Sequence, residues 1–382
     1  MLHFAPAEFD ARADRLRAEM AARGLDALLL FAPESHYWLT GYDTFGYCFF
    51  QCLVVTPERM ALVTRSADLR QAQLTSTLDD IRVWKDAAGA DPSADLWAML
   101  EGFGLSGRRL GWETDNHGLT MANGRRVEAR LSGRAQLVEA SDLVPALRLV
   151  KSPAEIALVR EAARIADAGW ARALPAIRPG AEEAEILAAL QGGMFAEGGD
   201  YPANPTIIGS GELALLCRFQ SGRRRLEARD QLTLEWAGVA RQYHVANMRA
   251  AIVGDPRPEH LKMHAAAREA LEACEAALRP GRPMAEVFDA HARVLDAHGL
   301  AAHRLNACGY SLGARFAPSW MDPQMFYEGA PAIMAENMVF FLHMILADSD
   351  SGAAMSLGRT SLIGPDGAEP LSRIPLELTV TG

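Results

Sequence analysis

The feature that most constrains this fold is an order of elements that occurs twice in the second part of the chain. From residue 153 the sequence predicts two helices and then strands, and from residue 260 the same order returns. Two such blocks indicate an internal duplication of architecture, although not of sequence. The predicted helices are 153–174, 181–197, 260–278 and 284–298, and the predicted strands are 206–208, 231–237, 245–253, 338–346, 354–363 and one near residue 310.

The start of this second part is marked by three residues. Ser152 suits the N-cap of a helix, Pro153 suits the first helical position, and Glu155 stands where it completes a capping box. Upstream, helical and strand patterns alternate to about residue 148, which is typical of an α/β domain. We therefore expect two domains, 1–148 and 149–382.

Charge and composition exclude several classes of partner. The chain has 38 Lys and Arg against 48 Asp and Glu, so its formal net charge of -10 lacks the basic surplus of nucleic-acid binders. No apolar run reaches the ~18 residues that cross a bilayer, and the first residues do not resemble an export signal. The 5 cysteines are scattered, as free thiols of a reducing cytoplasm would be. We expect a cytoplasmic protein with a small-molecule substrate and no nucleic-acid or membrane partner.

Short segments spread along the chain, taken in their order and spacing, carry a resemblance to a known family. They are Leu39–Tyr42, Leu149–Ala163, Ile208–Gly211, Gly309–Gly313 and Asn337–Phe340. In these segments the chain resembles the creatinase/prolidase/aminopeptidase P family. The resemblance implies an α/β (α+β) protein with a pita-bread catalytic domain at 149–382, preceded by a smaller creatinase-like α/β domain at 1–148.

Peptidases of that family hold two divalent metal ions with two Asp, one His and two Glu, because bridging carboxylates keep two cations close together. The five corresponding positions here are occupied by Glu235, Ala246, Tyr310, His343 and Gly358. With one carboxylate left, we expect no metal and no cofactor. The chain is then similar to the metal-independent members, creatinase and the ectoine hydrolases, which cleave C–N bonds in small amidine-like or guanidinium-like substrates.

Three residues at these positions are candidate catalytic groups. Glu235 lies in an apolar strand, where desolvation raises the pKa of a carboxyl group and makes it a general acid/base or a nucleophile. The alternative is a structural ion pair with Arg218 or Arg249. His343 is a candidate proton shuttle near neutral pH, or else a core histidine. Tyr310 is a candidate donor to a developing oxyanion, or else a packing residue.

Further residues are candidates for binding substrate. Arg218 replaces a family histidine, and its planar fork suits a carboxylate-bearing or zwitterionic substrate, unless it pairs with a nearby glutamate. His244 and Asn247 are candidate hydrogen-bonding groups, although strand alternation can turn Asn247 away. Trp320 and Tyr42 are candidates to hold a cationic group by cation–π attraction.

The resemblance also bears on assembly. The connection between two further predicted strands, 27–31 and 51–56, is formed by residues 35–47 and is rich in aromatic residues. Segments that expose many rings usually pack against a ligand or another subunit. In relatives of this fold the N-terminal domain of one subunit completes the active site of its partner, so we expect a homodimer.

Together these features predict a metal-independent hydrolase that cleaves a C–N bond (amide, amidine or cyclic amidine) in a small polar metabolite. Two alternatives stay open: an Xaa-Pro dipeptidase or aminopeptidase with metal ions, and a non-catalytic binding protein of the same fold. The residues alone do not identify the substrate, nor whether Glu235 is nucleophile, general base or structural.

Overall fold

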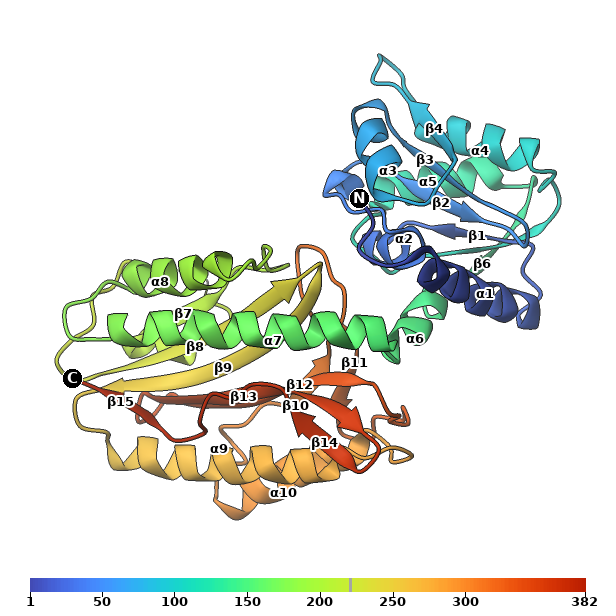
Figure 1. Cartoon of the computed structure of the whole chain (residues 1–382). Coiled ribbons are helices and arrows are strands. Elements are labelled where there is room, and N and C mark those ends of the chain that lie inside the picture. The colour runs from blue at the N-terminus through green and yellow to red at the C-terminus, as the bar shows by residue number, and fades with distance from the viewer. Residues whose placement is uncertain (220–221) are drawn as a thin grey trace. The chain divides into compact units, whose positions relative to one another are not determined.

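The computed structural model describes residues 1–219 and 222–382, which form two compact units, Met1–Arg148 and Leu149–Gly382 (Figure 1). Each unit has its own sheet and its own buried core. Among the described residues, no helix is both long and apolar enough to cross a membrane.

The N-terminal unit is a mixed sheet with helices, in the strand order β4-β3-β2-β1-β5-β6. The central strand β1 pairs antiparallel with β2 and parallel with β5, and it is completely buried. The strands are β1 (Ala27–Leu30), β2 (Cys52–Val55), β3 (Met60–Arg65), β4 (Asp80–Trp84), β5 (Arg109–Trp112) and β6 (Gln136–Glu139). The helices are α1 (Pro6–Ala22), α2 (Pro33–Thr40), α3 (Leu69–Thr75), α4 (Pro92–Gly102), α5 (Met121–Leu131) and α6 (Leu143–Leu149).

The first helix, α1, ends at a glycine, as is typical of helix C-termini. Gly24 has φ of 63°, a conformation that glycine adopts without strain. Its N–H donates to Ala21 O, and the N–H of Leu25 donates to Met20 O, which is the hydrogen-bond pattern of a Schellman motif. Gly24 therefore closes α1.

The prediction of an exposed aromatic connection is wrong for most of its rings. Residues 33–40 form the helix α2, and every residue of it is buried. A buried carboxylate holds the start of this helix, because Glu113 Oε2 accepts hydrogen bonds from the N–H groups of Phe31 and Ala32. Of the rings in the predicted segment, Phe45 is the well-exposed one at 80%.

The C-terminal unit is built on a sheet with the strand order β11-β10-β12-β13-β9-β8-β7, and β14 and β15 pair with β13 and β9. Helices α7 and α8 lie on one side of the strands, and α9 and α10 lie on the other (Figure 1). The strands are β7 (Ile207–Ser210), β8 (Asp230–Ala240), β9 (Tyr243–Val253), β10 (Ala307–Ser311), β11 (Asp322–Tyr327), β12 (Val339–Asp348), β13 (Ala353–Gly364), β14 (Gly367–Pro370) and β15 (Thr379–Thr381). The helices are α7 (Pro153–Ala173), α8 (Glu183–Ala196), α9 (Pro258–Ala277) and α10 (Ala285–Ala297).

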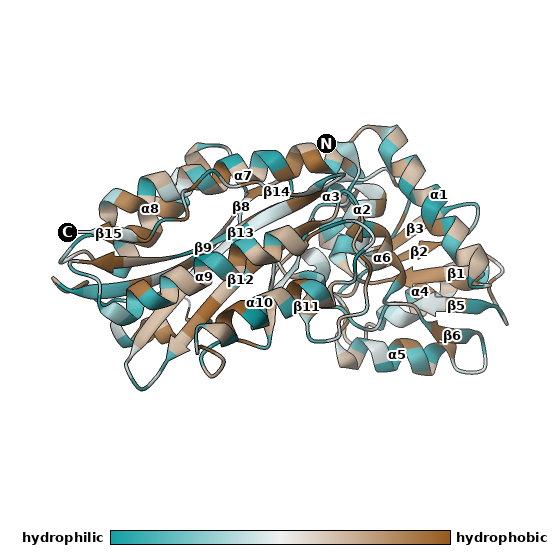
Figure 2. Ribbon diagram, turned by 90° about the horizontal axis from the view of Figure 1, so that it is seen from below, coloured by the Kyte–Doolittle hydropathy of each residue, from teal (hydrophilic) through white to brown (hydrophobic). Residues whose placement is uncertain are grey.

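The predicted capping box at the start of α7 is confirmed. Ser152 Oγ accepts from the N–H of Glu155 at 3.2 Å, and Glu155 Oε2 accepts from the N–H of Ser152 at 2.9 Å. Figure 2 shows hydrophilic and hydrophobic residues alternating along α7 and α9, as expected for helices with one face on a sheet and one on solvent.

The contact between α7 and β8 decides which way the side chains of β8 point. Trp236 Nε1 donates to Ala166 O of α7 at 3.0 Å, and its ring stacks on Trp170 with 5.2 Å between the ring centroids. At Gly238, a Cβ atom would collide with the backbone of α7. Since side chains alternate along a strand, Glu235 points to the opposite face of the sheet, away from α7.

Candidate active site

Strand register places three of the five candidate positions, Glu235, Gly358 and His343, in one row across the sheet. Glu235 of β8 pairs with Met248 of β9, Met248 pairs with Gly358 of β13, and Gly358 pairs with His343 of β12. Paired residues of neighbouring strands share a face, so these positions lie on the face opposite to α7. Two pairs of consecutive strands that are distant from each other in sequence, β8 with β9 and β12 with β13, thereby build one site.

A chain of hydrogen bonds extends from Glu235. Tyr310 on β10 donates its hydroxyl to Glu235 Oε1 at 3.1 Å, and Trp320 Nε1 donates to the Tyr310 hydroxyl oxygen at 2.8 Å. The Tyr310 ring also lies 5.7 Å from the ring of His343, centroid to centroid. The structure therefore brings together four of the predicted site residues, and their chemical roles stay predictions.

The Glu235 carboxyl group is buried, and its burial raises its pKa from 4.5 to about 7. The hydrogen bond from Tyr310 and the positive charge of Arg218 act in the opposite direction. Among the described residues no ion pair joins Glu235 to an arginine, and Arg249 instead donates to main-chain oxygens, including Gly358 O at 2.6 Å. Glu235 is therefore a titratable group near neutral pH and not half of a structural ion pair.

Arg218 is exposed, and its charge acts on three residues of the site. It lowers the pKa of Glu235, Tyr310 and His343, although burial has a larger effect on each of the three groups. This position suits a group that attracts the anionic end of a ligand toward the buried carboxyl group.

Burial also decides the state of His343. It lowers the pKa of the imidazole from 6.5 to about 3, so the ring is neutral at physiological pH. Its Nδ1 atom has no hydrogen-bond partner among the described residues. The low pKa argues against a proton shuttle near neutral pH and leaves His343 as a neutral hydrogen-bonding group.

Three predicted substrate-binding residues lie away from this centre. Asn247 pairs with Trp236 and so lies on the face toward α7, where strand alternation turns it from the site. His244 accepts the N–H of Ala203 at Nε2, and its place opposite Val239 puts it four residues along β8 from Glu235, about 13 Å away.

Tyr42 belongs to the core of the N-terminal unit. It is 1% exposed, its hydroxyl oxygen accepts from Gln51 Nε2 at 3.1 Å, and its ring stacks on His36. These contacts satisfy the side chain within its own unit. The structure therefore gives Tyr42 a packing role in place of the predicted contact with substrate.

The residues present do not fit a pair of metal ions. In residues 1–219 and 222–382, no group of three or more His, Cys, Asp or Glu side chains is arranged to hold a metal. The Tyr310 hydroxyl donates a hydrogen bond to the one carboxyl group of the set, and at Gly358 a Cβ atom would lie 2.6 Å from Leu342 O and 3.0 Å from the ring of Phe341. A longer acidic side chain at position 358 has no room without a shift of its neighbours.

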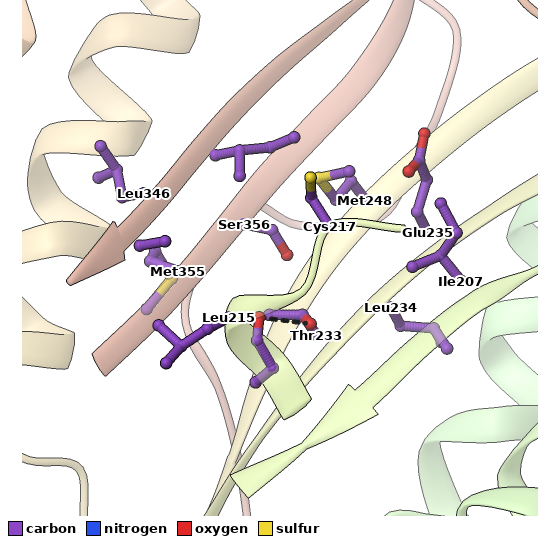
Figure 3. Close-up of a pocket in the computed structure, with 13 residues that line it drawn as sticks. Ile207, Leu215, Cys217, Thr233, Leu234, Glu235, Met248, Leu346, Met355 and Ser356 are labelled. Carbon is purple, nitrogen blue, oxygen red and sulfur yellow. Dashed lines mark hydrogen bonds between the residues drawn. The ribbon is translucent and has the colours of Figure 1, made fainter. Parts of the chain in front are cut away.

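A pocket adjoins this centre, and sequence reasoning missed most of it. Figure 3 shows Glu235 at one end of the pocket, Leu346 and Met355 at the other, and Ser356 between them. Thr233 and Ser356 stand two residues before Glu235 and Gly358, so strand alternation alone could have found both. The lining residues are Ile207, Ala214, Leu215, Cys217, Thr233, Leu234, Glu235, Met248, Ile345, Leu346, Ala347, Met355 and Ser356.

Comparison with known proteins gives consistent results. The model of metallopeptidase family M24 matches residues 157–364, and that of the creatinase/prolidase N-terminal domain matches residues 12–150. The ectoine hydrolase of Halomonas elongata is 27% identical over 399 residues, which cover 99% of this chain and 98% of that protein. A creatinase of a Bacillus species is 28% identical over 335 residues, 81% of this chain and 76% of that protein.

Solved structures show the same fold. An Xaa-Pro dipeptidase from Bacillus anthracis superimposes with a TM-score of 0.85 at 20% sequence identity, over 97% of this chain and 99% of that one. The predicted fold class, a pita-bread domain with a smaller creatinase-type N-terminal domain, is confirmed.

Proposed function

We propose that this chain, which belongs to metallopeptidase family M24, hydrolyses a C–N bond in a small polar metabolite without a metal ion. The ectoine hydrolase and creatinase relatives support a C–N hydrolase. The single observation that carries the finer proposal is Glu235: a buried carboxyl group with a pKa of about 7, which accepts a hydrogen bond from Tyr310. It stands where the family's peptidases hold metal.

The chemistry follows from a carboxyl group that is half ionised near neutral pH. As a carboxylate, Glu235 takes a proton from water while the water oxygen bonds to the electrophilic carbon. The protonated Glu235 then gives this proton to the leaving nitrogen as the C–N bond breaks, which returns the carboxylate. Proton transfer of this kind is most effective when the pKa of the group lies near the working pH.

Tyr310 and Arg218 have supporting roles in this proposal. Burial raises the pKa of the Tyr310 phenol, so it stays protonated and keeps a donor beside Glu235. Trp320 holds the phenol in place through its own hydrogen bond. Arg218 attracts a carboxylate on the substrate, which favours an anionic or zwitterionic metabolite.

An Xaa-Pro metallopeptidase is the second candidate, favoured by the match of the M24 family model over residues 157–364. The residues at the positions of the family's metal ligands argue against a metallopeptidase, since Ala246 and Gly358 have no side-chain donor for a metal. A non-catalytic binding protein is less well supported, because a protein that had lost its catalytic activity would not need a buried, titratable Glu235.

Glu235→Gln tests the proposal. The variant keeps the size of the side chain and removes its proton transfer, so turnover of amide or amidine substrates should fall about a hundredfold or more. Substrate binding, measured by calorimetry, should persist. Full turnover by a folded Glu235→Gln protein would contradict the proposed role.

Elemental analysis of the same wild-type protein tests metal independence. We expect no stoichiometric Mn, Zn, Co or Fe, and turnover unchanged after extensive chelation. Xaa-Pro dipeptides, assayed with added Mn²⁺ and Co²⁺, provide the comparison. Two tightly bound metal ions per chain, with dipeptide hydrolysis that chelation abolishes, would establish the metallopeptidase instead.

A further inference from the structure

The hydrogen bonds that reach Glu235 begin in the segment that precedes β7. Asn204 Oδ1 in this segment accepts from the main-chain N–H of Trp320 at 3.1 Å. The Trp320 indole donates to the Tyr310 hydroxyl oxygen at 2.8 Å, and this hydroxyl donates to Glu235 Oε1 at 3.1 Å. Segments that are distant in sequence are thereby joined, from the half-buried Asn204 to the buried carboxyl group.

The tryptophan fixes the direction of the last of these hydrogen bonds. An indole N–H can only donate, so the Tyr310 oxygen has to accept at that contact. A phenol has one proton, and this proton is then directed to the other partner, Glu235 Oε1. Trp320 and Tyr310 are buried, at 1% and 4% exposure, which limits competition from water for both hydrogen bonds.

The two oxygens of the Glu235 carboxyl group therefore have different surroundings. Oε1 accepts from the phenol. No described residue donates to Oε2, and this atom is not one of the buried polar atoms that lack a partner, so it belongs to the accessible part of a side chain that is 7% exposed. When the carboxyl group is neutral, its carbonyl oxygen is the acceptor and its proton is on the other oxygen, which is Oε2.

The other neighbours of Glu235 do not compete for Oε1. Its partners in the sheet are Ile207 of β7 and Met248 of β9, which carry no charge. His343 in the same row is neutral, because burial lowers its pKa to about 3. Arg218 is exposed and acts on Glu235 through its charge. The phenol is thus the one hydrogen-bond donor to this carboxyl group among the described residues.

We propose that Trp320 is a positioning residue, which keeps the phenol proton of Tyr310 on Glu235 Oε1 and thereby makes Oε2 the atom that exchanges protons with the substrate. In the proposed hydrolysis, Oε2 takes a proton from the water whose oxygen bonds to the electrophilic carbon. The same oxygen gives this proton to the nitrogen as the C–N bond breaks, and Tyr310 keeps its own proton throughout. The inference rests on the proposed function for its chemistry, but the place of the proton is measured without any substrate.

Infrared absorption of the full-length protein locates the proton. Glu235 is neutral at pH 5 and ionised at pH 9, so the difference between the two spectra contains its carbonyl band. Glu235→Gln identifies this band by abolishing it, whereas the band of Glu113, whose pKa is also about 7, remains. A carbonyl group that accepts from a phenol absorbs at lower frequency, so Tyr310→Phe should move the Glu235 band to higher frequency. A Glu235 band at the same frequency in wild type and Tyr310→Phe would overturn the proposal, and this comparison needs no Trp320 variant.

Trp320→Phe tests the tryptophan, with Trp236→Phe as the matched control. Each change removes one buried indole N–H, but Trp236 Nε1 donates to Ala166 O on the other face of the sheet. Without the Trp320 N–H, the phenol oxygen is free to accept from the neutral carboxyl group, so part of the molecules should carry the proton on Oε1. The Glu235 band should therefore move toward its position in Tyr310→Phe, and Trp236→Phe should leave it in place. An unmoved band in Trp320→Phe, or equal movement in both variants, would contradict the role of Trp320.

A double variant shows whether Trp320 acts through Tyr310. The hydrogen bond from Tyr310 lowers the pKa of Glu235, so Tyr310→Phe should raise it, by about one pH unit. Trp320→Phe should raise it by less, and it should have no further effect in the Tyr310→Phe background. Carbon-13 NMR of protein labelled at the glutamate carboxyl carbon measures these pKa values. Equal effects of Trp320→Phe in both backgrounds would reveal a purely structural role and reject the proposal.

The positioning role and the hydrolase fail in different ways. The expected infrared and NMR results, without turnover of any amide or amidine by wild type, would leave the roles of Trp320 and Tyr310 on Glu235 in place and reject the hydrolase. Turnover by wild type that Glu235→Gln abolishes and Trp320→Phe leaves unchanged would support the hydrolase and reject the positioning role.

Discussion

The burial of Glu235 has a cost in stability as well as a use in chemistry. A carboxyl group whose pKa in the folded protein lies near 7 is held in its neutral form over a range of pH in which the unfolded chain is ionised. Below pH 4.5 both states are protonated, so the group has no effect. Between pH 4.5 and about pH 7 the free energy of unfolding falls as the pH rises. Above about pH 7 the carboxyl group is ionised in both states, so it lowers the stability no further.

Glu235→Gln should therefore stabilise the protein at neutral and alkaline pH. The gain over wild type should be small at pH 5 and should reach on the order of 3 kcal/mol at pH 8, from the difference between the folded and unfolded pKa values. Denaturant unfolding at several pH values measures it. The pKa of Glu113 is also raised to about 7, so Glu113 adds its own pH dependence to the stability of both proteins. The quantity to follow is therefore the difference in free energy of unfolding between wild type and Glu235→Gln. A difference that does not change with pH would show that Glu235 is not held neutral.

At the scale of one element, β13 shows how the site excludes the family's metal ligands. Gly358 faces the site in the same row as Glu235, but its Cα approaches β12 closely. The ring of Phe341 fills the space that a side chain at position 358 would occupy. The glycine is thus part of the packing of the strand pair.

Gly358→Ala should destabilise the protein by about 1–3 kcal/mol, because overpacking a buried position forces neighbours to move. Gly364→Ala on the same strand is the control, since its Cβ would meet Gly367 O at 3.4 Å, an ordinary contact. Thermal unfolding of both variants measures the difference. We also expect that Gly358→Glu binds no metal. Equal stability of the Gly358→Ala variant and wild type would show that the site has room for a longer side chain.

At the scale of the whole molecule, we propose that the chain is a homodimer. The aromatic segment expected to mediate it is mostly buried, but Phe45 is 80% exposed and the nearby Phe49 is 42% exposed. The guanidinium carbon of Arg65 lies 4.0 Å from the centroid of the Phe49 ring and covers one of its faces. Phe45 is therefore the more accessible of the two rings. Exposed aromatic rings of this kind are enriched in interfaces.

Light scattering at micromolar concentration should give about twice 41.4 kDa. Phe45→Ser should shift the protein toward the monomer mass, because it removes apolar surface from the proposed interface. Tyr201→Ser is the matched control, since Tyr201 is also 80% exposed but belongs to the C-terminal unit. A monomer in the wild type would reject the proposal, and equal effects of both variants would place the interface elsewhere.

Much of the fold follows from local signals in the sequence. The capping box of Ser152 and Glu155 and the helix end at Gly24 involve residues close in sequence, so their pattern is readable without the fold. The strands that became β8, β9, β12 and β13 were visible as apolar runs for the same reason. The sequence also marked Glu235 as unusual, since a carboxyl group in an apolar strand has few ways to be solvated.

The tertiary structure decided which residues meet. Tyr310 and Glu235 are 75 positions apart, and their hydrogen bond depends on the register of strands that pair only in the folded sheet. The same register turned Asn247 toward α7, and packing within the N-terminal unit buried Tyr42. The pocket beside Glu235 likewise needs side chains from several strands. Local propensity determines elements, but contacts across a sheet depend on registers and faces that no single segment encodes.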